Sequence, residues 1–302
     1  MKLTSVPGYF SNYEELAQIP GQTNYAYTKI VSPGDDGVKR KNWQELLDSL
    51  PAGHKVFLVA RHGQGYHNLI VDTYGEPEWD RYWSKLNGDG ELEWFDAHLT
   101  ELGIKQVERT GSLIFNGQLD GVVPDVFYCS PLRRCIETFH NSWNQVANLQ
   151  ERGITDHDYD TIELNILEGL RETIGEHTCD KRQPISKTFK EYNLINFDQK
   201  NNAKKNSDLR LKLNYLPVYT EEDLLWKADQ RETNDEIDKR LSKCLQHIWE
   251  REKASGSNNK LISITCHEGV IQSILRVLNH ESIPRFETSG VVALVVKEDE
   301  EK

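Results

Sequence analysis

A short apolar run that ends abruptly in polar and charged residues constrains this fold more than any other feature. Residues Val56–Ala60 are apolar and include two valines. Arg61, His62 and Gly63 follow directly. A short apolar run of this kind predicts a buried strand, which would place Arg61 and His62 at the carboxyl edge of a sheet, where open α/β sheets build ligand sites. An arginine and a histidine there suit an anionic ligand on which the histidine does chemistry, and Gly63 would let the backbone approach that ligand.

The same ending recurs near the C-terminus. Residues Leu261–Cys266 predict a second buried strand, which runs into His267, Glu268 and Gly269. Apolar residues then recur at helical spacing up to Leu278, so a helix should follow. One histidine at a strand end is more often structural than catalytic. Two of them, one beside an arginine and both close to a glycine, favour a shared site.

Strands and helices alternate along the rest of the chain. Further strands are predicted at Val126–Cys129, Ile162–Leu167 and Val291–Val296, and helices at Glu101–Phe115, after Ser130–Pro131 and at Ile237–Ile248. Ser130 should be the N-cap of its helix, with Pro131 at the first helical position. The alternation predicts a three-layer α/β fold with a mainly parallel central sheet and helices on both faces.

The organisation that this pattern favours is one domain over residues 1–302. Residues 1–52 contain a short amphipathic helix near Trp43 and should wrap the surface. Residues 70–98, rich in tryptophan, and residues 173–230, polar and irregular, read as insertions that cap the site.

Charge and composition narrow the partners. The net charge of −12 and pI near 5.4 disfavour binding to nucleic acid or to an anionic membrane, so an anionic small molecule must find a local positive pocket. There is no apolar run long enough to span a membrane and no apolar signal-peptide core at Met1–Phe10. The expected location is cytoplasmic, and no oligomeric state is predicted.

The cysteines point to a reducing compartment and away from a metal site. The five cysteines are an odd number, and Cys129 and Cys266 close predicted buried strands, so reduced core thiols are expected. His177 and Cys179 would make half of a metal site, but no matching half is apparent. Neither a metal nor another cofactor is predicted.

The residues at the ends of four predicted strands fit a single kind of chemistry. They carry Arg61 and His62, then one of the arginines in Ser130–Arg134, then the carboxylates of Glu168–Glu172, then His267. Arginine donors form a fixed fork that holds a phosphoryl group, and a helix start also favours an anion. A neutral imidazole can attack phosphorus, and a protonated carboxyl can supply the leaving group with a proton. These parts suffice for phosphoryl transfer through a covalent histidine.

These motifs resemble those of the histidine phosphatase superfamily, in its phosphoglycerate-mutase-like branch. In chain order the matching segments are Arg61–Gly63, Leu99–Gly103 with Gln106, Ser130–Arg134, Leu170–Glu172 and Cys266–Gly269. The resemblance spans about residues 55–296 and implies a phosphoglycerate-mutase-like fold. A narrower resemblance is to the intracellular fungal phosphomutase-like proteins, some of which act as phosphatases. It rests on Val6–Phe10, Arg61–Asn68, Glu168–Glu172 and His177–Arg182.

The resemblance implies a role for each matching residue. His62 would be the nucleophile and Glu172 the general acid. The transferring phosphoryl group would be held by Arg61, Arg134 and His267, with a neutral contact from Asn68. Arg134 matches the family position, so Arg133 is expected to be a solvated or salt-bridged surface residue.

Other candidates near the site have two readings each. Gln64, like Gly63, could contact the ligand. Lys181 and Arg182 could grip the rest of a multiply charged substrate or be surface charges. Glu268 could repel substrate or tune His267, or it could simply be a carboxylate at a helix N-terminus. Contacts of His67 and His177 with the ligand stay open.

Two departures from the family pattern favour a phosphatase. Mutases follow their acid with R-H-Y-G, whereas Glu172 is followed by Thr173–Gly175, and mutases commonly have glutamate at the position of Gln64. The predicted function is a metal-independent phosphatase that hydrolyses phosphate esters or pyrophosphates of small metabolites through a phosphohistidine. The alternatives are a phosphomutase acting on phosphoglycerate or a sugar phosphate, and an inactive binding relative. The intact set of site residues argues against the last.

Overall fold

The computed structural model describes residues 1–12, 26–146, 161–194, 209–216, 219–256, 258–284 and 286–299. Its strands are β1 (Leu3–Val6), β2 (Ala26–Tyr27), β3 (His54–Arg61), β4 (Val126–Cys129), β5 (Thr161–Ile166), β6 (Arg210–Tyr215), β7 (Leu261–Cys266) and β8 (Val291–Glu298). Its α-helices are α2 (Trp43–Ser49), α3 (Tyr66–Tyr74), α4 (Glu76–Arg81), α5 (Glu101–Thr110), α6 (Arg133–Trp143), α7 (Ile185–Tyr192), α8 (Asn234–Ala254) and α9 (Glu268–Val277).

One sheet joins the described strands in the order β1-β8-β3-β7-β4-β5-β6, with β2 beside β8. Strands β3, β7, β4, β5 and β6 are mutually parallel, whereas β8 is antiparallel to β3 and to β1. The prediction of a mainly parallel central sheet is therefore confirmed. In the register of β3 with β7, Arg61 lies opposite Cys266, so the residues that follow them, His62 and His267, are neighbours.

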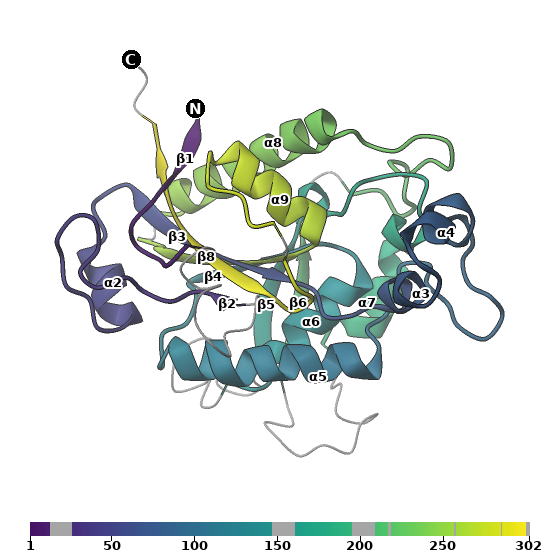
Figure 1. Cartoon of the computed structure of the whole chain (residues 1–302), viewed down its shortest axis with the longest axis horizontal. Coiled ribbons are helices and arrows are strands. Elements are labelled where there is room, and N and C mark those ends of the chain that lie inside the picture. The colour runs from purple at the N-terminus through teal and green to yellow at the C-terminus, as the bar shows by residue number, and fades with distance from the viewer. Residues whose placement is uncertain are drawn as a thin grey trace.

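The alternation of β3 builds two cores, one on each face of the sheet. Val56, Leu58 and Ala60 pack in a core with residues of α2 and α6. Phe57 and Val59 pack on the other face with residues of α8 and α9. Figure 1 shows α5 and α6 below the sheet and α8 and α9 above it. This is the three-layer arrangement that the sequence predicts.

Three helix boundaries differ from the sequence-based prediction. The helix after β4 begins at Arg133 with Leu132 at its N-cap, because the Ser130 hydroxyl is hydrogen-bonded to His267 instead of capping the helix. Helix α5 continues as a π-helix over Gly111–Gln118. Helix α8 is longer than predicted, since Thr233 and Glu236 form a reciprocal capping box at its start.

The segment 173–230 is more regular than predicted. It contains α7 and also β6, which forms the edge of the central sheet beside β5. The signal was the alternation in β6, where Leu211 and Leu213 are buried between polar neighbours. The polar residues around it obscured this period. Residues 195–208, within the same segment, lie outside the described residues.

The other two flanking segments contact the main body. Residues 1–52 contribute β1 and β2 to the sheet, and Trp43 of α2 is buried in the core. The tryptophan-rich segment 70–98 builds a small core of its own around Trp79 and Trp94, which includes Cys179 from the following segment. The segments 70–98 and 173–230 therefore pack on each other beside the carboxyl ends of the strands.

Candidate active site

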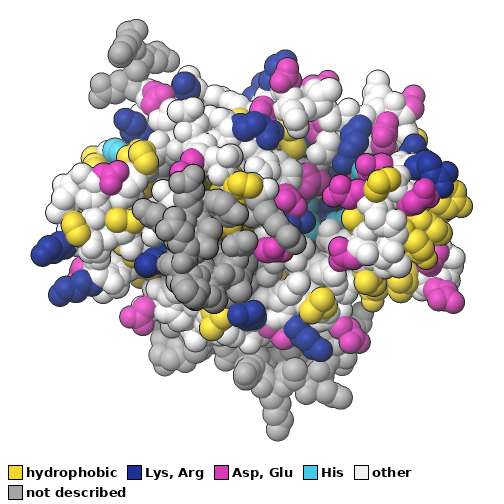
Figure 2. Space-filling model, viewed as in Figure 1, with side chains coloured by type: hydrophobic (Ala, Val, Ile, Leu, Met, Phe, Trp, Pro, Cys, Tyr) yellow, Lys and Arg dark blue, Asp and Glu magenta, His cyan; other side chains and the backbone are white. Residues whose placement is uncertain are grey.

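The carboxyl ends of four parallel strands bring the predicted site residues together. Strand β3 leads into His62, β4 into the start of α6, β5 into Glu172 and β7 into His267. The rings of His62 and His267 have their centroids 5.1 Å apart. Figure 2 shows histidine side chains inside a hollow bordered by acidic and basic side chains, next to the region of α3 and α4. The described residues therefore form a recessed, polar site at the predicted edge of the sheet.

His62 is held in a form suited to nucleophilic attack. Its Nδ1–H donates to the carbonyl of Gly63 at 2.7 Å, which leaves the lone pair on Nε2. The side chain is buried, and its pKa lies well below the ordinary value because burial, Arg134 and Arg61 all disfavour a second proton. The imidazole is therefore neutral at neutral pH, as a nucleophile must be.

Gly63 packs closely against α5, and its predicted close approach to a ligand stays a prediction. A Cβ at Gly63 would lie 2.6 Å from the Gly103 carbonyl of α5, and a Cβ at Gly103 would lie 2.1 Å from the carbonyl oxygen of Gln64. The backbone N–H of Gly63 donates to Thr138 at 3.0 Å, and that of Gln64 donates to Gln106 at 2.9 Å. These contacts fix the backbone that carries His62.

The side chain of Gln64 braces the same loop. Its Oε1 accepts from the Thr100 hydroxyl at 2.8 Å, and its Nε2 donates to Asp72 at 3.1 Å. Both ends of the amide are thus engaged by α3 and by the residue that caps α5. The structure gives Gln64 a bracing role where the sequence suggested a ligand contact.

Arg61 and Arg134 each keep a buried donor unpaired. Arg61 Nη1 donates to the Phe286 carbonyl and pairs with Glu268 at 2.7 Å. Arg134 is fully buried, and its two terminal nitrogens donate to the Cys179 carbonyl at 2.6 Å and to Asp180 at 2.8 Å. The Nε atoms of both arginines are buried with no hydrogen-bond partner in the described structure. Buried donors without partners are rare, so two of them beside His62 favour an anionic ligand.

Glu172 is held by backbone amides and is suited to donate a proton. Its Oε1 accepts from Thr173 N–H at 2.9 Å, and its Oε2 accepts from Gly269 N–H at 3.2 Å. Burial raises the pKa of Glu172, with a smaller contribution from Asp180, so the carboxyl keeps its proton to higher pH than usual. A Cβ at Gly269 would lie 2.2 Å from Oε1, so only glycine leaves room for this carboxyl.

His267 is also buried and neutral. Its Nε2 lies 2.7 Å from the Ser130 hydroxyl and 3.4 Å from Cys135 Sγ. Burial and then Arg134 lower its pKa well below the ordinary value. Ser130 and Cys135 fix the ring orientation, and the sequence analysis assigned neither of them this role.

His67 and Asn68 lie at the start of α3. Asn68 Oδ1 accepts from the Gly65 N–H at 3.0 Å, so the oxygen caps the helix and only the amide nitrogen remains for the predicted neutral contact. The His67 ring centroid lies 5.4 Å from that of His62, and its buried Nδ1 has no partner in the described part of the chain. His67 thus lies against His62, and its contact with a ligand stays a prediction left open by the sequence.

The structure places the predicted basic residues of the second segment differently. Arg182 is buried, with Nε donating to Glu168 and its terminal nitrogens donating to four backbone carbonyls, those of Thr220, Glu221, Glu222 and Gln183. It has no donor left for a ligand. Arg182 is therefore neither a surface charge nor a residue that binds substrate. Lys181 lies with its ammonium 4.7 Å from the Trp226 ring centroid.

Arg133, predicted to be a solvated or salt-bridged surface residue, is not at the surface, although it does lie within ion-pair distance of Glu191, at 4.0 Å. It is buried, its Nε donates to the Asp96 carbonyl at 2.6 Å, and its Nη2 donates to the Phe95 carbonyl at 2.7 Å. The long side chain crosses to the tryptophan-rich segment and fixes it. Glu268, whose role was open, is half-exposed and pairs with Arg61.

A three-residue cluster resembles a metal site but does not suit one. The donor atoms of His177, Cys179 and Asp180 lie within 4.8 Å of one another. However, Asp180 already pairs with Arg134 and Arg231, and burial raises the pKa of the Cys179 thiol far above its ordinary value. A cation there would have to displace two guanidinium groups and deprotonate a buried thiol. Metal independence stays a prediction.

The residues that sequence reasoning missed are the partners of the predicted ones. Asp180 is the clearest, because it fixes Arg134 from the opposite side of the pocket. It lies within the segment His177–Arg182 that carries the narrower resemblance. The signal was a physical one: a buried arginine needs a carboxylate to hold it, and Asp180 is the nearest unassigned acid in that motif.

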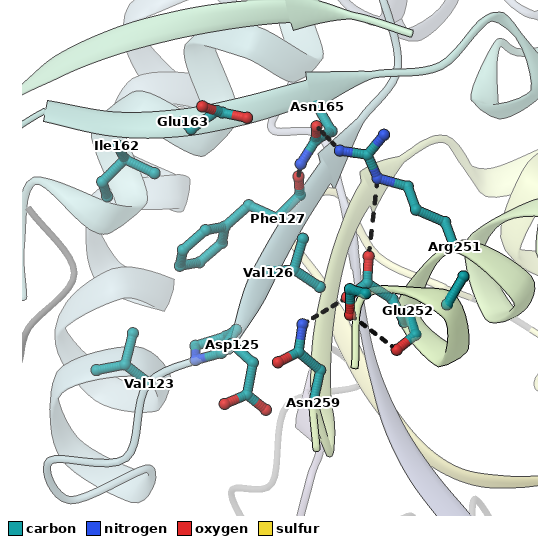
Figure 3. Close-up of a pocket in the computed structure, with 13 residues that line it drawn as sticks. Val123, Asp125, Val126, Phe127, Ile162, Glu163, Asn165, Arg251, Glu252 and Asn259 are labelled. Carbon is teal, nitrogen blue, oxygen red and sulfur yellow. Dashed lines mark hydrogen bonds and ion pairs between the residues drawn. The ribbon is translucent and has the colours of Figure 1, made fainter. Parts of the chain in front are cut away.

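A second hollow lies at the opposite end of the sheet. It has a volume of ≈ 780 Å³ and is lined by residues at the amino ends of β4 and β5 and by the end of α8. Figure 3 shows several of its polar side chains bonded to one another, with Glu252 accepting from Asn259 and Asn165 donating to the Phe127 carbonyl. Its lining contains no histidine, and its Glu163 accepts from Lys212 and Asn214.

The comparisons with known proteins agree with this geometry. The family model of the histidine phosphatase superfamily (branch 1) matches residues 57–206. The chain is 42% identical to the probable phosphoglycerate mutase PMU1 of Saccharomyces cerevisiae, over 98% of this chain and 96% of that protein. This chain belongs to the histidine phosphatase superfamily. It is also 33% identical to a probable phosphoglycerate mutase of Arthroderma benhamiae, over 97% of this chain and 84% of that protein.

Membership confirms the family and the phosphoglycerate-mutase-like fold expected from the motifs. A third relative, phosphomutase-like protein 3 of Candida albicans, is 27% identical over 97% of this chain and 81% of that protein, in keeping with the narrower resemblance to fungal phosphomutase-like proteins. Two bulk expectations can also be compared with the structure. All five cysteines are buried and free. Among the described residues, no helix combines the length and the apolar character needed to cross a bilayer.

Proposed function

We propose that this member of the superfamily is a metal-independent phosphatase that acts on small phosphorylated metabolites through a phosphohistidine. One observation carries the proposal. A neutral imidazole, fixed through Nδ1 to the Gly63 carbonyl, lies beside two arginines whose buried Nε–H groups have no partner among the described residues. A tetrahedral phosphoryl group satisfies both donors and presents phosphorus to His62 Nε2.

The first step forms the phosphoenzyme. The lone pair of His62 Nε2 attacks phosphorus as the bond from phosphorus to the leaving oxygen breaks. Glu172, whose raised pKa favours its acid form, gives its proton to that oxygen. Arg61 and Arg134 stabilise the charge on the equatorial oxygens throughout.

The second step regenerates the enzyme. Glu172, now a carboxylate, takes a proton from water, and the resulting hydroxide attacks phosphorus. The N–P bond breaks, inorganic phosphate leaves, and His62 is again neutral. The same two groups thus serve both half-reactions, and no metal is needed to supply charge or a nucleophile.

A phosphomutase is the second candidate, because two of the relatives bear the name probable phosphoglycerate mutase. A mutase returns the phosphoryl group to a substrate instead of water. The departures after Glu172 and at Gln64 favour the phosphatase. The choice is tested by comparing phosphate release from a panel of phosphorylated metabolites with interconversion of 2- and 3-phosphoglycerate in added bisphosphoglycerate. Interconversion that exceeds phosphate release would establish the mutase instead.

The phosphohistidine itself is tested with His62→Ala. The variant should stay folded and lose nearly all phosphate release, and rapid quench of the unmodified enzyme with labelled substrate should trap an acid-labile, base-stable phosphoprotein. His247→Ala, which removes an exposed histidine of α8, is the matched control and should keep full activity. Activity should persist in a strong chelator and be inhibited by vanadate. Substantial turnover by His62→Ala, or activity that depends on added magnesium, would overturn the proposal.

A further inference from the structure

One buried carboxylate connects the phosphoryl pocket to an additional arginine. Asp180 Oδ1 lies 2.8 Å from Arg134 Nη2, and its other oxygen, Oδ2, lies 3.4 Å from Arg231 Nη1. Arg231 precedes α8, and its Nη1 also donates to the Gly175 carbonyl at 2.8 Å. The two guanidinium groups therefore lie on either side of a single carboxylate, one inside the pocket and one at its border.

Arg231 has hydrogen-bond donors that are available to a ligand. Its side chain is 28% exposed, whereas the side chain of Asp180 is 3% exposed. Its Nε and Nη2 make no hydrogen bond within the part of the chain that the structure describes. Asp180 carries one negative charge and faces two positive ones, so these three side chains together are positive in a protein whose net charge is −12, and Asp80 and Glu176 are the acids near His177 at the same border. A local positive excess of this kind attracts an anion against the overall field.

The arginines around Arg231 are differently placed. Arg171 is fully buried between Glu168 and Asp223, and Arg240 divides its donors between Glu232 and backbone carbonyls. All three guanidinium nitrogens of Arg240 have partners, and the unpaired Nε of Arg171 is buried. Arg231 differs from both because it combines exposure with donors that have no partner among the described residues.

A histidine lines the same border. The His177 side chain is 12% exposed, and Arg231 is close enough to it to lower its pKa, after burial, so the ring is neutral and can donate one hydrogen bond. His62, His67, His177 and Arg231 are thus successive neighbours: the His62 and His67 ring centroids lie 5.4 Å apart, and the charges of His177 and Arg231 act on His67 and His177 respectively.

We propose that Arg231 binds a second anionic group, carried by the leaving group, while Arg61 and Arg134 hold the phosphoryl group that is transferred. The preferred substrates are then phosphate compounds with a further phosphoryl or carboxylate group close to the bond that breaks. This inference rests on the proposed function, which it deepens by naming the substrate class.

The test compares substrates that differ in this second charge. Inorganic pyrophosphate and 3-phosphoglycerate carry it as a phosphoryl group and as a carboxylate, whereas p-nitrophenyl phosphate lacks it. Arg231→Gln should lower kcat/KM at least about tenfold for whichever charged substrate is preferred, and less than about threefold for p-nitrophenyl phosphate, because only the former loses a charge-assisted hydrogen bond. Arg231→Lys should recover part of the loss. Arg276→Gln, at a half-exposed arginine of α9 paired with Asp238, is the control and should change neither.

A second measurement keeps this inference separate from the proposed function. Calorimetric titration of the unmodified protein with pyrophosphate and with inorganic phosphate should show tighter binding of pyrophosphate, and Arg231→Gln should abolish that difference. If no substrate is turned over, the proposed function fails, but the titration still tests Arg231. Equal loss on all three substrates would show that Arg231 only supports Asp180, and equal binding of the two anions by the unmodified protein would likewise overturn the inference.

Discussion

Two neighbouring arginines at the start of α6 illustrate a division that runs through the molecule. Arg133 donates through Nε and Nη2 to the carbonyls of Asp96 and Phe95, and its Nη1 lies 2.6 Å from His98 Nε2. Arg134 is equally buried but keeps its Nε unpaired in the described structure. The first belongs to a bracing network, made by Arg133, Arg171, Arg182 and their partners, and the second to a pocket with a donor left over beside His62. Burial alone therefore does not distinguish the roles of Arg133 and Arg134, whereas the pairing of their guanidinium nitrogens does.

The carboxylates divide in the same way. Glu168 accepts from Arg182 Nε at 2.5 Å and from Arg171 Nη1 at 3.1 Å, so two guanidinium groups fix its position. Glu172 faces two backbone amides, and burial raises its pKa. The acid of the bracing network thus has guanidinium partners, whereas the acid of the pocket is held by backbone amides and has a raised pKa.

The largest effect should come from replacing Glu172, the acid of the pocket, with a residue that has no acidic proton to donate. Glu172→Gln should lower kcat/KM for an alkyl phosphate by roughly 10²–10⁴, because an alkoxide leaves poorly without a proton. The loss for p-nitrophenyl phosphate should be much smaller, since nitrophenolate leaves unaided. Steady-state kinetics with both substrates check this, on kcat/KM because dephosphorylation can limit kcat for both. Equal losses would place Glu172 in the bracing network instead.

The pH dependence of the unmodified enzyme follows from the same pKa shifts. With an alkyl phosphate, kcat/KM should fall as pH rises through the raised pKa of Glu172, because the acid form is lost. It should also fall as pH drops through the lowered pKa of His62, because the nucleophile becomes protonated. The alkaline limb should be absent with p-nitrophenyl phosphate and in Glu172→Gln, while the acidic limb remains in both.

The next largest effect separates the two adjacent arginines. Arg134→Lys should reduce kcat/KM by about 10²–10³, since the loss of a preorganised donor to the developing charge costs that much. Arg133→Lys should leave kcat/KM of the folded protein nearly unchanged and lower the free energy of unfolding. Steady-state kinetics and chemical denaturation of both variants measure these changes in activity and stability. A larger kinetic loss in Arg133→Lys would contradict the division.

A smaller effect, on stability alone, is expected from the bracing network. Arg182→Met should lower the free energy of unfolding by about 2–3 kcal/mol, less than for a fully buried pair because Glu168 is partly exposed and keeps Arg171. Denaturant titration measures the loss. Since Arg182 has no donor directed at a ligand, kcat/KM of the folded fraction should stay within about threefold. A selective rise in KM would instead indicate that Arg182 binds substrate, which is one of the two roles considered in the sequence analysis.

The smallest effect concerns the ion pair between Arg61 and Glu268, which lies at the border between the bracing network and the pocket. Glu268 pairs with Arg61 at 2.7 Å and is half-exposed, so it competes weakly with an anion for the same guanidinium. Glu268→Gln should therefore tighten competitive inhibition by inorganic phosphate by about two- to fivefold. Weaker inhibition would mean instead that Glu268 holds Arg61 in position. Glu281→Gln, at an exposed glutamate outside the site, is the control.

The sequence predicted the parts of the site that follow directly from strand ends. Strands β3 and β7 are short, largely apolar and followed by histidine and glycine, so their position and parallel pairing were readable. The edge strand β6 was not, because its period-2 pattern is short and lies between polar stretches. The start of α6 was misplaced because Ser130 has two uses for its hydroxyl, and the contact with His267, 137 residues away, prevails over local capping.

Sequence reasoning failed most where a residue type has two opposite uses. Arginine binds phosphate and also ties loops together, and spacing along the chain does not distinguish these uses. Arg182 and Arg133 therefore could not be assigned from sequence, nor could Asp180 as the partner of Arg134, because the contacts come from segments distant in the chain. Only the three-dimensional partner of each donor decides between the two uses.

The glycine after Glu268 makes two distant positions depend on each other. Any side chain at Gly269 would occupy the place of the Glu172 carboxyl, and the amide of the same residue is one of the two that hold it, across 97 positions of sequence. A larger residue at position 269 would therefore have to displace the end of the Glu172 side chain. The occupant of position 269 thus determines where the carboxyl of residue 172 can lie.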